Sequence, residues 1–329
     1  MAERTIEFES PHFLHSLFAE DLPLLRDMEE SLSVRITTRD AWIKLEGDEV
    51  NVEAAVAVIE DLEEARRRGG AITASTFRYA VNAASESLSR AVTEASAEIE
   101  AGDRVSDLFE CKLLGTGSKP AVTPRTKNQL RYLEALERND VSFGIGPAGT
   151  GKTFLAMAYA LDLLKKRRVD RILLTRPAVE AGEALGFLPG ALEEKVLPYL
   201  RPLYDAMSEM LDSSDTLKFT EKNMIEIAPL AYMRGRTLNR ACVILDEAQN
   251  ATREQMFMFL TRLGEESKCI ITGDPSQIDL KPKSKSGLLE AMDLLRGIEG
   301  IAFTEFEGGD VVRHPVVARI IQAYEDGRE

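Results

Sequence analysis

A glycine-rich loop holds the residues with the most recognisable chemistry. It reads Gly146-Pro147-Ala148-Gly149-Thr150-Gly151-Lys152-Thr153 and follows the phosphate-binding pattern G-x-x-x-x-G-K-T. In such a loop the backbone N–H groups point at an anion, the lysine reaches the β- and γ-phosphates, and the threonine hydroxyl binds Mg²⁺. The pattern predicts that all eight residues bind ATP, with Lys152 also catalytic and Thr153 also a metal ligand. A chance glycine-rich turn is the alternative, and the apolar strand and helix expected on either side argue against it.

Two carboxylates end the apolar run at residues 241–245. Asp246 and Glu247 follow it directly, and ligand sites in open α/β sheets lie at the carboxyl ends of strands. We expect Asp246 to hold Mg²⁺ through a water molecule, and Glu247 to orient and deprotonate the attacking water. The alternative is an acidic helix start with Asp246 as its N-cap.

A third polar turn follows the apolar run at residues 269–272. It reads Gly273-Asp274-Pro275-Ser276-Gln277 and is similar to the Gly-Asp-x-x-Gln of superfamily 1 helicases, in which the glutamine senses the γ-phosphate. Gln277 is therefore a candidate catalytic residue, although a plain Gly-Asp-Pro turn would have the same sequence. Upstream, residues 124–132 resemble the adenine-binding element of such helicases. Gln129 would pair with the adenine edge, and Tyr132 would either stack or pack in the core.

The acid Glu247 and the lack of a guanine-binding motif distinguish between a kinase, a GTPase and an ATP hydrolase. A kinase passes phosphate to an acceptor and has no need of a water-activating acid at Glu247, whereas a hydrolase does. A GTPase normally carries Asn-Lys-x-Asp, and the nearest sequence here, Glu221-Lys222-Asn223-Met224, does not match it. ATP hydrolysis is therefore the predicted reaction.

Strands and helices alternate from Ala121 onward, which gives these motifs their expected positions. Apolar runs of strand length lie at 141–145, 171–175, 241–245, 269–272 and 301–303, with helical patterns such as 154–164 between them. This order predicts an α/β fold, a parallel, doubly wound sheet with helices on both faces that carries the P-loop after its first strand.

The first seventy residues show a different pattern. Strands are expected at 5–8, 34–37 and 42–45, and helices at 13–32, broken near residues 21–23, and at 52–65. This order predicts a small α+β domain at 1–70. Residues 71–118, rich in Ala, Ser and Glu, predict one short helix near Phe77 and then a mobile connector. Residues 119–329 are predicted to form the P-loop domain.

Composition limits the class of protein. The 329 residues carry a net charge of −14, and residues 1–70 alone hold 8 basic and 17 acidic residues, a charge of −9. No apolar run is long enough to span a bilayer, and the first residues lack a signal-peptide core. The widely spaced Cys111, Cys242 and Cys269 predict reduced thiols in a cytoplasmic protein.

Taken together, the motifs resemble the PhoH-like ATPase family. The resemblance runs from about residue 123 to 324 and rests on the P-loop and on segments 175–180, 185–190, 231–237, 246–250 and 310–315. The first seventy residues also resemble the KH-like domain of the bacterial long form. The resemblance implies a RecA-like ATPase of RNA metabolism, an RNA helicase-like motor that assists ribosomal RNA maturation with a YbeY-type endoribonuclease.

The first domain departs from an RNA-binding KH domain. Such a domain grips RNA with a Gly-x-x-Gly loop, but the matching bend here reads Ala19-Glu20-Asp21-Leu22. With its charge of −9, this domain is expected to dock a protein, and RNA is expected to bind the ATPase domain.

We expect one RecA-like domain here, because the 55 residues that follow Asp274 are too few to form a second. A homo-oligomer, expected to be a hexameric ring, would supply the missing face of the nucleotide site. Arg313 is the expected arginine finger, a catalytic residue acting on a neighbour's γ-phosphate, with Arg262, Arg234 and Arg236 as further candidates. Each of these arginines could instead form a structural salt bridge.

A function of another class fits the same motifs. A nucleotide-gated binding module would recruit a nuclease or a ribosomal partner without separating strands. A motor should hydrolyse ATP faster with RNA, whereas a switch should turn over slowly and bind its partner according to the nucleotide. A P-loop kinase is a further alternative and would release no free phosphate without an acceptor.

Overall fold

The computed structural model describes residues 2–91, 104–115, 119–177, 201, 203–280 and 285–311. Contacts divide the chain into two compact units, Met1–Lys112 with Thr123–Leu130, and Leu113–Val122 with Arg131–Glu329. Within the described residues, no helix is long and apolar enough to cross a membrane.

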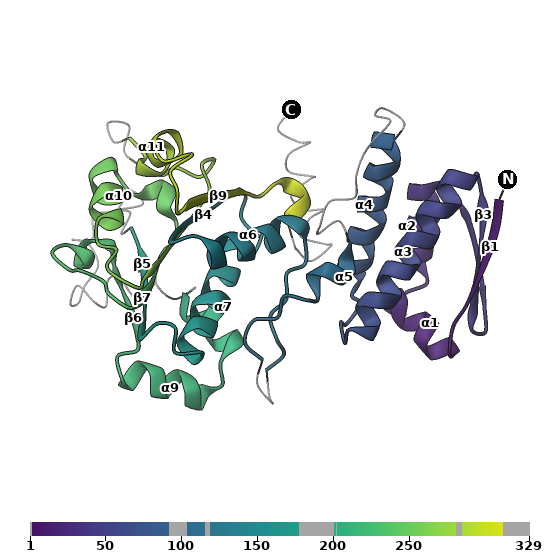
Figure 1. The fold of residues 1–329 in the computed structure, drawn as a ribbon, viewed down its shortest axis with the longest axis horizontal. Helices are drawn as coiled ribbons and strands as arrows, with labels where there is room; N and C mark the ends of the chain where they lie inside the picture. Colours follow the sequence, from purple (N-terminus) through teal and green to yellow (C-terminus); the bar gives the residue numbers. More distant parts are fainter. Residues whose placement is uncertain are drawn as a thin grey trace. The chain divides into compact units, whose positions relative to one another are not determined.

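The first unit has the predicted α+β composition (Figure 1). Its first elements are β1 (Ala2–Glu7), α1 (Pro11–Leu17), α2 (Pro23–Leu32), β2 (Arg35–Arg39), β3 (Trp42–Gly47) and α3 (Glu49–Arg67). The strands pair antiparallel in the order β1-β3-β2. The break expected near residues 21–23 is confirmed, because the chain leaves the helical conformation at Ala19 and Glu20, whose φ values are 55° and 57°.

A helix of 18 residues, α4 (Ala74–Ala91), stands where the sequence predicted one short helix near Phe77. Phe77 and Val81 are buried in the core of this unit, together with Val105 of the short helix α5 (Val105–Leu108). The prediction of a short helix was wrong because it weighed local composition above tertiary burial, which stabilises most helices in proteins. The boundaries at residues 70 and 118 concern independent folding and stay a prediction.

A parallel sheet forms the centre of the second unit and confirms the predicted α/β fold. Its described strands are β4 (Val141–Ile145), β5 (Arg171–Arg176), β6 (Ile225–Pro229), β7 (Ala241–Leu245), β8 (Lys268–Gly273) and β9 (Ile301–Glu305). They lie in the order β6-β5-β7-β8-β4-β9, and the neighbouring pairs are parallel. Strand β6 was not predicted, because its Ile-Glu-Ile-Ala-Pro sequence carries a charged residue and a proline and lacks an apolar run like the Ala-Cys-Val-Ile-Leu of β7.

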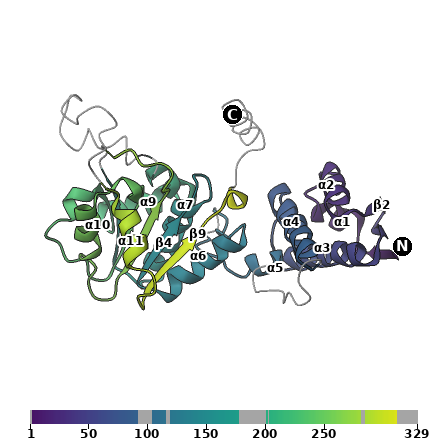
Figure 2. The same ribbon diagram turned by 90° about the horizontal axis from the view of Figure 1, so that it is seen from above.

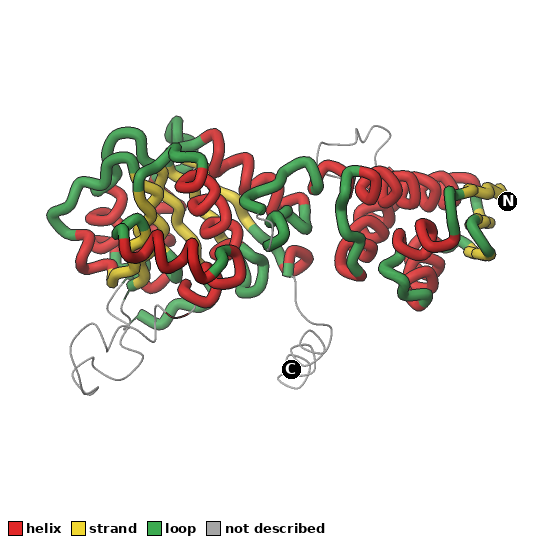
Figure 3. Tube along the Cα trace, turned by 90° about the horizontal axis from the view of Figure 1, so that it is seen from below, coloured by secondary structure: helices red, strands yellow, loops and turns green. Residues whose placement is uncertain are grey.

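Helices cover both faces of this sheet. They include α6 (Lys127–Arg138), α7 (Lys152–Lys165), α9 (Ser213–Glu221), α10 (Arg253–Leu260) and α11 (Gly287–Leu294), with short 3₁₀ turns η2 (Leu230–Met233), η3 (Ala248–Asn250) and η4 (Gly308–Asp310). Figures 1 and 2 show α7 on one side of the sheet and α10 and α11 on the other. Figure 3 shows the strands enclosed between these helices.

The strand order determines where the polar loops meet. Strand β8 lies between β4 and β7, so the loops that follow these three parallel strands are neighbours at one edge of the sheet. They are the loops that carry the P-loop, the Asp246 and Glu247 pair, and Gln277.

Candidate nucleotide-binding site

The loop between β4 and α7 has the closed geometry of an anion site. Gly146 has a φ of 146°, and a Cβ there would lie 2.4 Å from the Phe306 carbonyl oxygen, so glycine is required. The Gly146 N–H donates to the Gly273 carbonyl of β8 (3.1 Å), and the buried Thr150 hydroxyl donates to the Pro147 carbonyl (3.0 Å). Helix α7 begins at Lys152, so its N-terminal N–H groups and positive dipole end lie at the loop.

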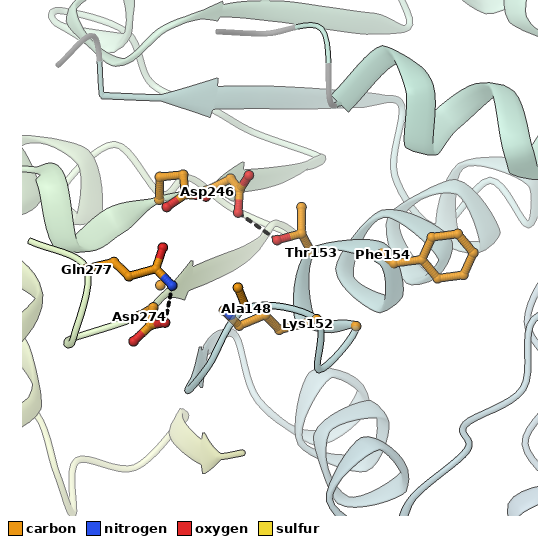
Figure 4. Close-up of a pocket in the computed structure, with 11 residues that line it drawn as sticks. Ala148, Lys152, Thr153, Phe154, Asp246, Asp274 and Gln277 are labelled. Atoms are coloured by element: carbon orange, nitrogen blue, oxygen red, sulfur yellow. Dashed lines mark hydrogen bonds between the residues drawn. The ribbon is translucent and has the colours of Figure 1, made fainter. Parts of the chain in front are cut away.

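A cavity of about 250 Å³ opens beside this loop (Figure 4). Its lining residues come from the P-loop and the first turn of α7, from the loop after β7, and from the end of β8 with the loop that follows it: Ala148, Gly149, Gly151, Lys152, Thr153, Phe154, Asp246, Glu247, Gly273, Asp274 and Gln277. The structure thus brings together five residues that the sequence analysis singled out for chemistry: Lys152, Thr153, Asp246, Glu247 and Gln277.

The Asp246 carboxylate is the most heavily bonded group of the site. It is 2% exposed. Its Oδ1 accepts hydrogen bonds from the hydroxyls of Thr153 (2.7 Å) and Thr272 (2.7 Å), and its Oδ2 accepts one from Arg176 Nε (2.7 Å). Arg176 Nη2 also lies 2.5 Å from Oδ2 and 3.6 Å from Glu247 Oε1. The Asp246 carboxylate is therefore held by side chains from two strands, β5 and β8, and from the P-loop.

Lys152 lies inside the P-loop. Its side chain is buried, and its Nζ donates to the Pro147 carbonyl at 2.9 Å. Burial lowers the pKa of the Lys152 ammonium, whereas the negative charges of Asp274, Asp246 and Glu247 act in the opposite direction. The ammonium is therefore placed to compensate these acids or the charge of a phosphate.

The donor set fits a magnesium ion. The Thr153 hydroxyl and the Asp246 carboxylate, 2.7 Å apart, are hard oxygen ligands of the kind that Mg²⁺ prefers. Three carboxylates and one cation, Lys152, line the cavity, and Arg176 lies against two of these acids, Asp246 and Glu247. A triphosphate would therefore enter this acidic site more readily with a divalent cation than alone.

Comparison with known proteins agrees with this geometry. The PhoH-like protein family matches residues 121–325, and a PhoH-like protein of Bacillus subtilis is 47% identical over 97% of this chain and 96% of its own length. The chain belongs to the PhoH-like family. A PhoH-like protein of Mycobacterium tuberculosis is 47% identical over 91% of this chain and 81% of its own length. Protein PhoH of Escherichia coli is 45% identical over 62% of this chain and 58% of its own length.

The P-loop geometry and the family membership make this a P-loop nucleotide-binding protein. Among solved structures, a Sulfolobus solfataricus SWI2/SNF2 ATPase core in complex with double-stranded DNA is 15% identical with a TM-score of 0.30, covering 46% of this chain and 32% of that one. This similarity is too low to support any conclusion about the chain.

The two residues of the expected adenine-binding element are both buried. Gln129 is 4% exposed, its Oε1 accepts from the Arg125 N–H (2.7 Å), and it is not among the residues that line the cavity. Its contact with adenine stays a prediction. Tyr132 is fully buried and packs edge-on against Phe306, with ring centroids 5.4 Å apart. Of the two roles considered for Tyr132, the structure supports core packing.

The candidate arginines have different surroundings. Arg236 forms two hydrogen bonds with the Glu226 carboxylate (2.6 and 2.7 Å), the structural salt bridge considered as its alternative role. Arg262 donates to the carbonyl oxygens of Met258 and Arg236. Arg234 is exposed, and Arg313 lies outside the described residues.

Sequence reasoning missed Arg176, Thr272 and Gln249 as parts of the site. Arg176 and Thr272 stand at the carboxyl ends of β5 and β8. A signal was available for both, since polar residues at the ends of apolar strands share one edge of a parallel sheet. Gln249 reaches the site through the 3₁₀ turn η3, which has no comparable sequence pattern.

Replacing Arg176 with Met should destabilise the nucleotide-free protein by about 2–3 kcal/mol, because the buried Asp246 carboxylate would lose its cation and keep two hydroxyl donors. The matched control is Arg240→Met, whose partners Asp170 and Glu266 are exposed, so that its loss should lower the stability far less than the loss of Arg176. Urea unfolding of both variants measures the difference. Equal losses would show that the Arg176 ion pair adds nothing beyond a surface pair.

Proposed function

We propose that this chain binds ATP with Mg²⁺ in the cavity and hydrolyses it. The observation that carries the proposal is the 2.7 Å contact between the Thr153 hydroxyl and the Asp246 carboxylate, with Glu247 on the wall of the same cavity. A P-loop hydroxyl and a strand-end carboxylate converge there beside a second acid, which is the arrangement that hydrolysis of a triphosphate requires.

Each group of the site has a task in this reaction. The N–H groups at the start of α7 and the Lys152 ammonium bind the phosphates. Glu247 takes a proton from water as the water oxygen bonds to the γ-phosphorus, the bond from that phosphorus to the β,γ-bridging oxygen breaks, and ADP leaves with the electron pair. Thr153 and Asp246 would hold Mg²⁺, whose positive charge would offset the negative charge of the phosphate oxygens. Gln277, which also lines the cavity, would contact the γ-phosphate.

RNA is the proposed target of the ATP cycle, bound through the ATPase domain. The support is the similarity of the 273–277 turn to that of helicases and the family resemblance. Phosphate release measured with and without single-stranded RNA, alongside strand separation of a labelled duplex, tests this. Faster release with RNA and strand separation support a motor. Slow, RNA-insensitive turnover would favour the nucleotide-gated binding module instead.

The first unit is proposed to dock a protein, with a YbeY-type endoribonuclease as the proposed partner. The support is the charge of −9 over residues 1–70 and the acids Glu20 and Asp21 at the bend between α1 and α2. Acids at this place would repel the phosphates of RNA.

A ring of subunits, with six as the expected number, is proposed to complete the nucleotide site through Arg313. Mixing inactive Arg313→Ala subunits with inactive Lys152→Ala subunits should restore part of the ATPase activity, because some interfaces would pair an intact P-loop with an intact arginine. Phosphate release and particle mass of the mixture are the measurements. If assemblies that are proven to be mixed recover no activity, Arg313 acts on the nucleotide of its own subunit or has a structural role.

A further inference from the structure

The segment that follows Glu247 is fastened to the loop that follows β8. Four hydrogen bonds between described residues make this connection: Asp274 N–H to Gln249 Oε1 (3.0 Å), Asp279 N–H to Asn250 Oδ1 (2.8 Å), Ser286 hydroxyl to the Gln249 carbonyl (2.9 Å) and Gly287 N–H to the Ala251 carbonyl (2.8 Å). Because these bonds are distributed along both segments, we expect residues 249–251 to move together with the described residues 274–279 and 286–287.

Gln249 is the member of this connection that reaches Glu247. Its Nε2 donates to Glu247 Oε2 at 2.6 Å, while its Oε1 accepts from the Asp274 N–H. The side chain is 1% exposed. Reversing the amide would set Nε2 against an N–H donor and Oε1 against a carboxylate, so the two partners together fix its orientation.

Glu247 needs such a support. Its side chain is 44% exposed, and its backbone is in the left-handed region with φ 53° and ψ 39°. An exposed glutamate has several rotamers of similar energy. Arg176 Nη2 lies 3.6 Å from Oε1, too far for a hydrogen bond. The Gln249 amide is therefore the group that sets the direction of Oε2.

The packing around Gly273 permits this contact. A Cβ at Gly273 would lie 3.0 Å from Gln249 Oε1 and 2.7 Å from Leu288 Cδ2. A side chain there would push the amide away from the Asp274 N–H. On the other side of Asp274, its Oδ2 accepts a hydrogen bond from Gln277 Nε2 at 2.8 Å (Figure 4). Asp274 and Gln249 thus connect Gln277 to Glu247 through hydrogen bonds.

We infer that Gln249 is a positioning residue that aims the Glu247 carboxylate and transmits to it the position of the Asp274–Gln277 turn. This inference rests on the proposed role of Glu247 as the base. Contact between Gln277 and the γ-phosphate would then align the base, so that water is activated when the triphosphate is in place. A misplacement of about 1 Å in such a group can cost about 10²-fold in rate.

Replacing Gln249 with Leu, which keeps the volume and removes both hydrogen bonds, is expected to lower kcat by about 10–100-fold while the Kd for ATP changes by less than about two-fold. The matched control is Ser286→Ala, which removes another bond of the same connection without touching the amide and should keep kcat within about three-fold of wild type. Gln249→Glu keeps the acceptor for the Asp274 N–H and sets a carboxylate against Glu247, so it should lose kcat even if the Leu variant folds poorly.

The double variant Glu247→Gln with Gln249→Leu separates this inference from the proposed function. If Gln249 acts through Glu247, the double variant is no slower than Glu247→Gln alone. Additive losses, an unchanged kcat in Gln249→Leu, or an equal loss in Ser286→Ala would each overturn the positioning role. Wild-type turnover in Glu247→Gln alone would instead overturn the role of Glu247 itself.

Discussion

Replacing Glu247 with Gln is expected to leave ATP binding intact and to slow hydrolysis by about 10²–10⁴-fold. The amide keeps the size of the side chain and cannot accept the proton of the attacking water. Binding should persist because the P-loop, Lys152, Thr153 and Asp246 are unchanged. Single-turnover phosphate release gives the rate, and titration with a fluorescent ATP analogue gives the affinity.

The control for Glu247 is an exposed glutamate whose loss changes the net charge equally. Glu265→Gln serves, because this side chain is exposed and is not among the residues that line the cavity. Its hydrolysis rate should match that of the wild type. Turnover near the wild-type value in Glu247→Gln would exclude Glu247 as the base.

Replacing Lys152 with Ala should weaken ATP binding and lower turnover together, with kcat reduced by about 10²–10³-fold, the typical cost of losing a transition-state charge donor. The ammonium is buried in the loop among three carboxylates. Without it, the phosphates would face these acids uncompensated. The same two assays measure both losses.

Lys165 provides the matched control at the other end of α7. Its ammonium pairs with Asp215 at 3.4 Å, so Lys165→Ala removes a lysine from the same helix without touching the cavity. Binding and turnover should stay at wild-type values. A Lys152→Ala protein that binds ATP as tightly as the wild type would contradict the assignment of this lysine to the phosphates.

Part of this site could be predicted because its information is local. The P-loop spacing and the acids that end β7 are continuous in sequence, and the central strands β4, β7 and β8 are short, mostly apolar segments. The order β4-β8-β7 could not be read locally, because it depends on crossovers between distant segments. The same reason hides Gln249 and Arg176, whose partners lie 25 and 70 positions away.

The left-handed backbone at Glu247 has an evolutionary consequence. Glycine adopts φ near 53° freely, whereas a residue with a Cβ gives up about 1–2 kcal/mol there. A substitution by Gly would therefore ease the fold and remove the proposed base in one step. The chain thus keeps Glu247, which lowers the stability of the fold, at the position of the proposed base. At this site selection for activity favours glutamate, whereas selection for stability favours glycine.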